Sequence, residues 1–104
     1  MDESIQKHLE EPLTDVGVLL LAADLIEARG LERHNYESPD GALCVQGAIN
    51  VACGEEPRSP FGHIQARALF LLQSHLNGEM AHIWIQDNSV SKADVVALMR
   101  KAAR

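Results

Sequence analysis

Two cysteines and five histidines are the residues of this chain whose chemistry could support a reaction or a metal site. Cys44 and Cys53 lie nine residues apart, which on one continuous helix puts their side chains about half a turn out of phase. Both therefore cannot ligate the same ion from such a helix. The chain has no C-x-x-C, H-x-x-x-H or H-E-x-x-H pattern, the spacings typical of metal sites. The sequence predicts no metal site and no cofactor.

Cys44 is the candidate nucleophile of the chain. A thiol near the start of a helix can have a lowered pKa, and His34 in the preceding segment could serve as its base. Cys44 nevertheless lies among small apolar residues, where a buried, inert thiol is the commoner outcome. No G-x-S-x-G, P-loop or dinucleotide-binding glycine pattern is present. We predict that the protein is not an enzyme and has no catalytic residue. The alternative is a small enzyme or ligand-binding protein that uses Cys44, His34 and the segment 31–41.

Helices are the elements that must position these residues. Thr14 is a good N-cap and Gly30 a good stop for a first helix, and its apolar residues cover most of its circumference, as in the central helix of a bundle. Ser91 with Asp94 three residues later forms a capping-box pattern for the last helix. The fold prediction is an all-α compact bundle of about four principal helices, over residues 14–29, 41–53, 60–77 and 91–103.

The predicted starts of the two middle helices are based on residues typical of turns and helix caps. We expect Asp40 to cap the second helix and Ser59-Pro60 to begin the third. On the second helix, Gly47 and its small neighbours would let the first helix approach closely, while Asn50 would face solvent. Residues 80–86 alternate like a strand but have no convincing partner strand, so we predict a short helix there.

An exposed aromatic residue is predicted on the third helix. The expected core stripe of that helix includes Ile64, Leu72 and His75, and Phe70 falls nearly opposite to it at 100° per residue. Either another segment covers Phe70, such as the arm at residues 1–13 with Ile5 and Leu9, or a partner does. The candidate interaction surface consists of Phe70, Leu20, His63 and Ser74.

Chain length and net charge limit the number of domains and the kinds of partner that we expect. A chain of 104 residues makes one domain, which we divide into an acidic N-terminal arm at 1–13 and a single helical domain at 14–104. Nine basic and fifteen acidic residues give a net charge of −6, which disfavours contact with phosphate backbones. Binding to nucleic acid is therefore not expected. The acidic N-terminus and the short apolar runs predict no membrane association and a cytoplasmic location.

The order of several short motifs resembles that of a known family. The segment Gly41-Ala42-Leu43-Cys44-Val45-Gln46-Gly47-Ala48 contains a G-x-x-C-x-x-G-A pattern, and Trp84 with Asp87-Asn88 precedes the last helix. This order resembles a family of small actinobacterial and actinophage proteins of unknown function, over most of residues 18–103. Leu31 replaces the first Trp of that family, and Trp84-Ile85-Gln86-Asp87 replaces its Trp-Asn-Asp turn. The resemblance implies a helical fold and a phage or actinobacterial source, and no activity.

The absence of a reactive constellation and the predicted exposure of Phe70 favour an interaction protein over an enzyme. We predict a non-catalytic module that binds another protein, either a second copy of the chain in a homodimer or a foreign partner such as a host protein.

Overall fold

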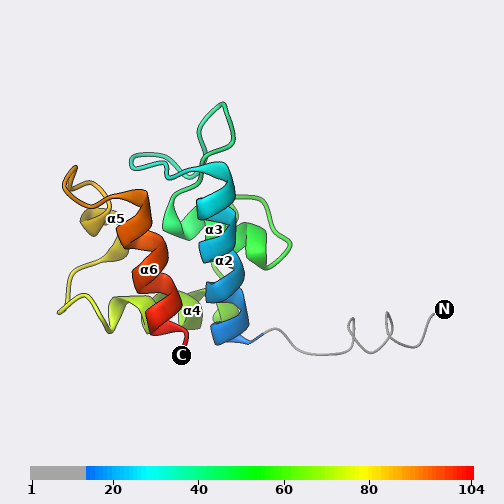
Figure 1. Cartoon of the computed structure of the whole chain (residues 1–104). Coiled ribbons are helices and arrows are strands. Elements are labelled where there is room, and N and C mark those ends of the chain that lie inside the picture. Colours follow the sequence, from blue (N-terminus) through cyan, green and yellow to red (C-terminus); the bar gives the residue numbers. More distant parts are fainter. Residues whose placement is uncertain (1–13) are drawn as a thin grey trace.

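The computed structural model describes residues 14–104, and within them the chain forms five helices (Figure 1). The predicted arm at residues 1–13, including Ile5 and Leu9, lies outside the described residues. The all-α prediction is confirmed, because the extended pairing in the described range is limited to two isolated bridges. The helices are α2 (Asp15–Arg29), α3 (Val45–Ala52), α4 (His63–Gln73), α5 (Ala81–Trp84) and α6 (Lys92–Ala102).

Helix α2 is the centre of the arrangement, as its wide apolar surface predicts, and it packs against α3, α4 and α6. The Thr14 hydroxyl caps its first turn by accepting the amide of Gly17 at 2.9 Å. At its other end Gly30 has a φ of 103°, and its amide donates to the Ile26 carbonyl at 2.8 Å. Because a positive φ strains residues with a Cβ, glycine suits this stop.

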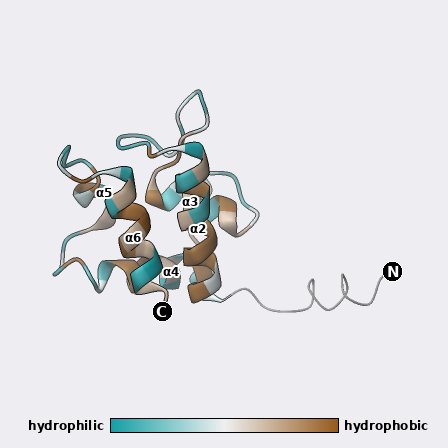
Figure 2. Cartoon of the chain, viewed as in Figure 1, coloured by the Kyte–Doolittle hydropathy of each residue, from teal (hydrophilic) through white to brown (hydrophobic). Residues whose placement is uncertain are grey.

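The core lies where α2 meets the other helices. Figure 2 shows hydrophobic residues along much of α2 and α6, whereas the loops are mostly hydrophilic. The largest side chains in this core are almost completely buried, and they come from α2, α3, α4 and α6, from the segment before α3 and from the residue that follows α5. They are Leu19, Ile26, Leu43, Ile49, Leu72, Ile85 and Met99.

Helices α5 and α6 match their predictions. Residues 81–84 form a short helix, and Ser91 and Asp94 form the expected capping box. The Ser91 hydroxyl accepts the Asp94 amide at 3.1 Å, and the Asp94 carboxylate accepts the Ser91 amide at 3.0 Å. Arg100 also joins α6 to α2, with ion pairs of 2.9 Å to Asp24 and to Glu27.

The second helix begins four residues later than predicted, at Val45 rather than at 41. The reason is that Leu43 is held in an extended conformation by the preceding loop. Its amide donates to the Gly30 carbonyl and its carbonyl accepts the Glu32 amide, both at 3.0 Å. Asp40 does not cap the helix; its carboxylate accepts a hydrogen bond from the Ser38 hydroxyl. Cys44, predicted to lie inside the helix, is its N-cap.

The third helix is shorter than predicted at both ends. It begins at His63 rather than at Pro60, because Gly62 is its N-cap and the Gln65 side chain accepts the Gly62 amide at 3.1 Å. It ends at Gln73, whose side chain accepts the amide of Ala81 at 2.9 Å and so ties α4 to α5. His75 therefore falls in a turn and is exposed, so the prediction that it belongs to the buried stripe is wrong.

Asn50 is completely buried, which contradicts the prediction that it faces solvent. Its side-chain amide donates to the carbonyl oxygens of Pro57 at 3.0 Å and Ser59 at 2.8 Å. Its side-chain oxygen lies 3.5 Å from the Gln65 amide nitrogen. Asn50 thus fastens the loop between α3 and α4, and these bonds offset the cost of burying a polar group.

Gly47 allows a close approach, but to a different partner from the one predicted. A Cβ on Gly47 would overlap the carbonyl oxygen of Tyr36, which belongs to the loop and not to α2. That carbonyl accepts the Cys44 amide at 3.2 Å. The glycine therefore lets the loop lie directly against the first turn of α3.

Candidate functional site

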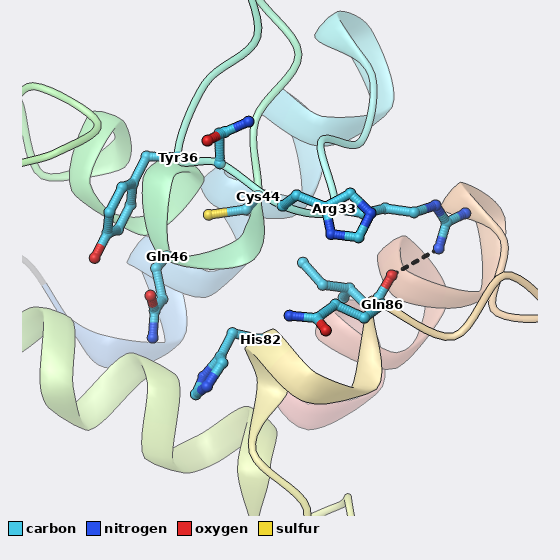
Figure 3. A pocket seen from close by; sticks show the side chains of 9 residues that line it. Arg33, Tyr36, Cys44, Gln46, His82 and Gln86 are labelled. Carbon is cyan, nitrogen blue, oxygen red and sulfur yellow. Dashed lines mark hydrogen bonds between the residues drawn. The ribbon is translucent and has the colours of Figure 1, made fainter.

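A cavity of about 400 Å³ lies between the loop at 33–36, the start of α3 and the end of α5 (Figure 3). The first two walls are close in the sequence, whereas the α5 wall lies far from both, so only the fold brings all three together. Most of the side chains that line it carry polar groups. Besides the loop residues 33–36, the lining contains Cys44 and Gln46 from the second wall, and His82, Ile85 and Gln86 from the third.

Arg33 holds the loop wall against the α5 wall. Its Nη1 donates to the Ile85 carbonyl at 2.8 Å and to the Asp87 carbonyl at 3.2 Å, the first of which is drawn in Figure 3. The loop is also fixed from within, because the Glu32 carboxylate accepts the amides of Arg33 at 2.9 Å and His34 at 3.0 Å. These bonds, led by the one from the His34 amide, lower the pKa of Glu32.

Cys44 lies at the base of the cavity with 7% of its surface exposed. Its sulfur caps α3 by accepting the Gly47 amide at 3.2 Å. Burial is the main influence on this thiol and raises its pKa, and the Gly47 amide opposes this effect only in part. A raised pKa favours the protonated thiol over the nucleophilic thiolate, so we expect Cys44 to react slowly.

The structure brings Cys44 and His34 to the same cavity but does not form the pair that the catalytic alternative needs. His34 is exposed, and within the described residues no hydrogen bond joins its ring to the sulfur. A base must lie within hydrogen-bond reach of the thiol to activate it. The geometry thus gives the catalytic alternative no support.

We expect Cys44 to react slowly with a thiol reagent at neutral pH, and Cys53 to react faster. Cys53 is the matched control, since it is also a free cysteine with a pKa raised by burial, but it is less buried than Cys44. Mass spectrometry of the native protein after brief treatment with iodoacetamide measures both rates. Rapid modification of Cys44 before Cys53 would instead support a reactive thiol.

We also expect Cys44→Ala to lower the free energy of unfolding by about 1 kcal/mol, as for loss of a small buried group. The substitution removes the sulfur that caps α3 but leaves every exposed side chain in place. Urea denaturation measures the loss of stability. Binding to a partner should be unchanged, and a loss of binding without a loss of stability would contradict a purely structural role for this cysteine.

Several residues of the cavity were not predicted from the sequence. Gln46, His82 and Gln86 carry no spacing signal, because the packing of α3 and α5 brings them to the cavity. The Nδ1 atom of His82 is buried and has no hydrogen-bond partner within the described residues. The predicted segment 31–41 was the only part of this cavity, besides Cys44, that the sequence indicated.

The predicted interaction surface has Phe70 at its centre. Phe70 is 71% exposed, so the prediction that it points away from the core is confirmed within the described residues. His63 and Ser74 are exposed on the same side of α4, about 20° and 40° from Phe70 by helical spacing. Leu20 is also exposed, at 41%, but it lies on α2. We call Phe70, His63, Ser74 and Arg67 the Phe70 face.

Arg67 connects the Phe70 face to the start of α2. Its guanidinium lies 3.7 Å from the carboxylate of Asp15, and its own side chain is 70% exposed. An ion pair this exposed contributes little to stability. The pair places a basic side chain, three residues before Phe70 in α4, next to an acidic one.

Neither a metal centre nor a membrane span is found in residues 14–104. No group of three or more His, Cys, Asp or Glu side chains in this range could hold a metal ion. No helix in the same range is both long and apolar enough to cross a membrane.

The chain is therefore a small all-α protein that carries the exposed Phe70 face on α4 and a cavity between the loop 33–36, α3 and α5. The family model of a family of unknown function (DUF6197) matches residues 10–104, so the chain belongs to this family. No curated protein and no solved structure matches the chain.

Proposed function

We propose that this protein is a non-catalytic interaction module and that a second copy of the chain binds its Phe70 face. The observation that supports this proposal is the 71% exposure of Phe70 on the side of α4 opposite the core. Burying a Phe side chain contributes roughly 1.5–3 kcal/mol relative to leaving it in water. A contact that covers it is therefore favourable.

A symmetric dimer would bury the Phe70 face of both copies in a single contact, because the same patch lies on both sides of a twofold axis. The charges at its edge are compatible with this arrangement. The exposed Arg67 lies beside Asp15, so each copy presents both signs of charge. In an antiparallel contact of two α4 helices, opposite charges can meet around the pair of Phe70 rings.

The dimer should be weak. A stable interface buries about 800 Å² on each partner, whereas one aromatic side chain supplies only about 150–250 Å². We therefore expect a dissociation constant on the order of 0.1–1 mM. A foreign protein that recognises the same face would compete with self-association.

Replacement of Phe70 by Asp should abolish self-association, because it places a charge at the centre of the contact. We expect static light scattering on the wild type to show a mean mass that rises toward two chains with concentration. Phe70→Asp should stay at the mass of one chain. Its free energy of unfolding should change by about 1 kcal/mol or less, because the residue is exposed.

Leu21→Asp is the matched control, since Leu21 is an exposed apolar residue on a different helix, at 46% exposure. It should dimerise like the wild type. A wild type that remains monomeric, together with a strongly destabilised Phe70→Asp, would show that Phe70 packs within its own chain and would end the interface proposal.

The setting we propose is that of an accessory protein in an actinobacterium or its phage. The support is the order of motifs around Cys44 and Trp84, which resembles small proteins from those sources. Both cysteines are free, which suits a reducing compartment such as the cytoplasm.

A further inference from the structure

Two carboxamide side chains that line the cavity, Gln46 and Gln86, have no hydrogen-bond partner among the described residues, in contrast to three carboxamides that help to hold the fold together. Asn50, Gln65 and Gln73 each form side-chain hydrogen bonds that hold segments together. Within residues 14–104, the side chains of Gln46 and Gln86 form none, although both line the cavity. Their hydrogen-bonding groups are therefore available to a bound molecule.

Gln46 and Gln86 come from opposite walls, and their side chains extend into the space between α3 and α5 (Figure 3). A carboxamide presents one donor and one acceptor side by side. Its best match is a molecule with an adjacent acceptor and donor in one plane, so that both bonds form together. Nucleobases have such edges, and Asn and Gln pair with them in this bidentate manner.

Two aromatic rings add flat surfaces to the same cavity. Tyr36 lies beside Gln46, and the His82 ring lies on the α5 side (Figure 3). Planar bases stack on rings of this kind, and the stacking does not depend on the identity of the base. A volume of about 400 Å³ is also within the range of small-molecule sites, about 300–1,000 Å³.

The charges around the cavity indicate whether it suits an uncharged nucleoside or a nucleotide that carries phosphate. Arg33 is the one formally charged residue in the lining, and its Nη1 is already bonded to two carbonyl groups. Two carboxylates, Glu32 and Asp87, adjoin the lining residues in sequence. Hydrogen bonds from neighbouring backbone amides lower the pKa of both, so they are ionised at neutral pH. These two negative charges offset the attraction that the Arg33 guanidinium would exert on a phosphate group.

From these contacts we propose that the cavity binds a nucleobase in a neutral form, as a free nucleoside, through Gln46 and Gln86. This site is separate from the Phe70 face, and it does not depend on self-association. Phosphate contributes nothing favourable to recognition here, so a nucleoside should bind better than its 5′-monophosphate.

The test is a titration of the ¹⁵N-labelled full chain with adenosine, guanosine, cytidine and uridine, and with their 5′-monophosphates, followed by NMR. We expect at least one nucleoside to give saturable shifts confined to the loop 33–36, Cys44–Gln46 and His82–Gln86. Its monophosphate should bind at least threefold more weakly. The same result is expected in Phe70→Asp, which separates this proposal from the proposed function.

Gln86→Ala should weaken binding about tenfold, as expected for loss of a bidentate contact. Gln86 is exposed, so the variant should fold normally. Asn88→Ala is the matched control, because Asn88 is an exposed carboxamide nearby that does not line the cavity, and it should bind like the wild type. Absence of saturable shifts with every nucleoside, tighter binding of the monophosphates, or equal binding by Gln86→Ala would overturn the proposal.

Discussion

Asn50→Asp is expected to lower the free energy of unfolding by about 3 kcal/mol or more, the largest effect of any single substitution considered for this protein. The change keeps the shape of the side chain but replaces its amide donor by a carboxylate oxygen. That oxygen would face the carbonyls of Pro57 and Ser59, which now accept bonds of 3.0 and 2.8 Å. A buried charge opposite two acceptors is costly, and the Gln65 amide, 3.5 Å from the other side-chain oxygen, is too distant to offset that cost.

Urea denaturation at neutral pH measures this effect. Asn88→Asp makes the same chemical change at an exposed position and should alter stability by about 0.5 kcal/mol or less. If both variants were equally stable, Asn50 would not hold the loop between α3 and α4, and its role in the fold would have to be revised.

Gly47→Ala is expected to have the second largest effect on stability. It should destabilise the protein, although alanine has a higher helix propensity than glycine. Alanine normally stabilises the interior of a helix by about 1 kcal/mol relative to glycine. Here the added methyl group would overlap the Tyr36 carbonyl oxygen, and a backbone atom cannot move aside cheaply. We expect a net loss of about 2–3 kcal/mol, with displacement of the loop that walls the cavity.

Thermal or urea unfolding measures the change, and NMR shifts of residues 33–36 report the displacement of the loop. Ala97→Gly calibrates the propensity effect, because Ala97 is exposed within α6 and should lose about 1 kcal/mol. A Gly47→Ala variant more stable than the wild type would mean that the loop does not lie against α3.

The helices whose ends are set by neighbouring residues could be predicted from the sequence. Thr14 and Gly30 bound α2, and the Ser91–Asp94 box begins α6, each through bonds that span three or four residues. Periodicity alone was sufficient to place Phe70 on the outside of α4.

The starts of α3 and α4 could not be predicted, because contacts distant in sequence set the first and a competing local cap sets the second. Leu43 is held extended by Gly30 and Glu32, which delays α3. Ser59-Pro60 is typical of a helix start, but α4 begins after Gly62, where the Gln65 side chain accepts the Gly62 amide. Asn50 was placed in solvent because the carbonyls it binds lie in a loop whose position only the fold determines.

The residues of the cavity could be predicted only in part, because some of them meet only when helices distant in sequence pack together. Cys44 and the 31–41 loop were recognised by residue type, and the structure does bring them together. Gln46, His82 and Gln86 join them only through the packing of α3 beside α5. Residue type also suggests a reactive thiol, whereas the structure shows that Cys44 caps α3 and that burial raises its pKa.

An intermolecular NOE experiment tests most directly whether the Phe70 face joins two copies of the chain. Equal amounts of ¹³C-labelled and unlabelled protein are mixed at a concentration near 1 mM, within the range expected for a weak dimer. We predict filtered NOEs from the Phe70 ring of one copy to the α4 residues of the other, and their loss in Phe70→Asp. A spectrum without such NOEs, while light scattering shows dimers, would contradict the account.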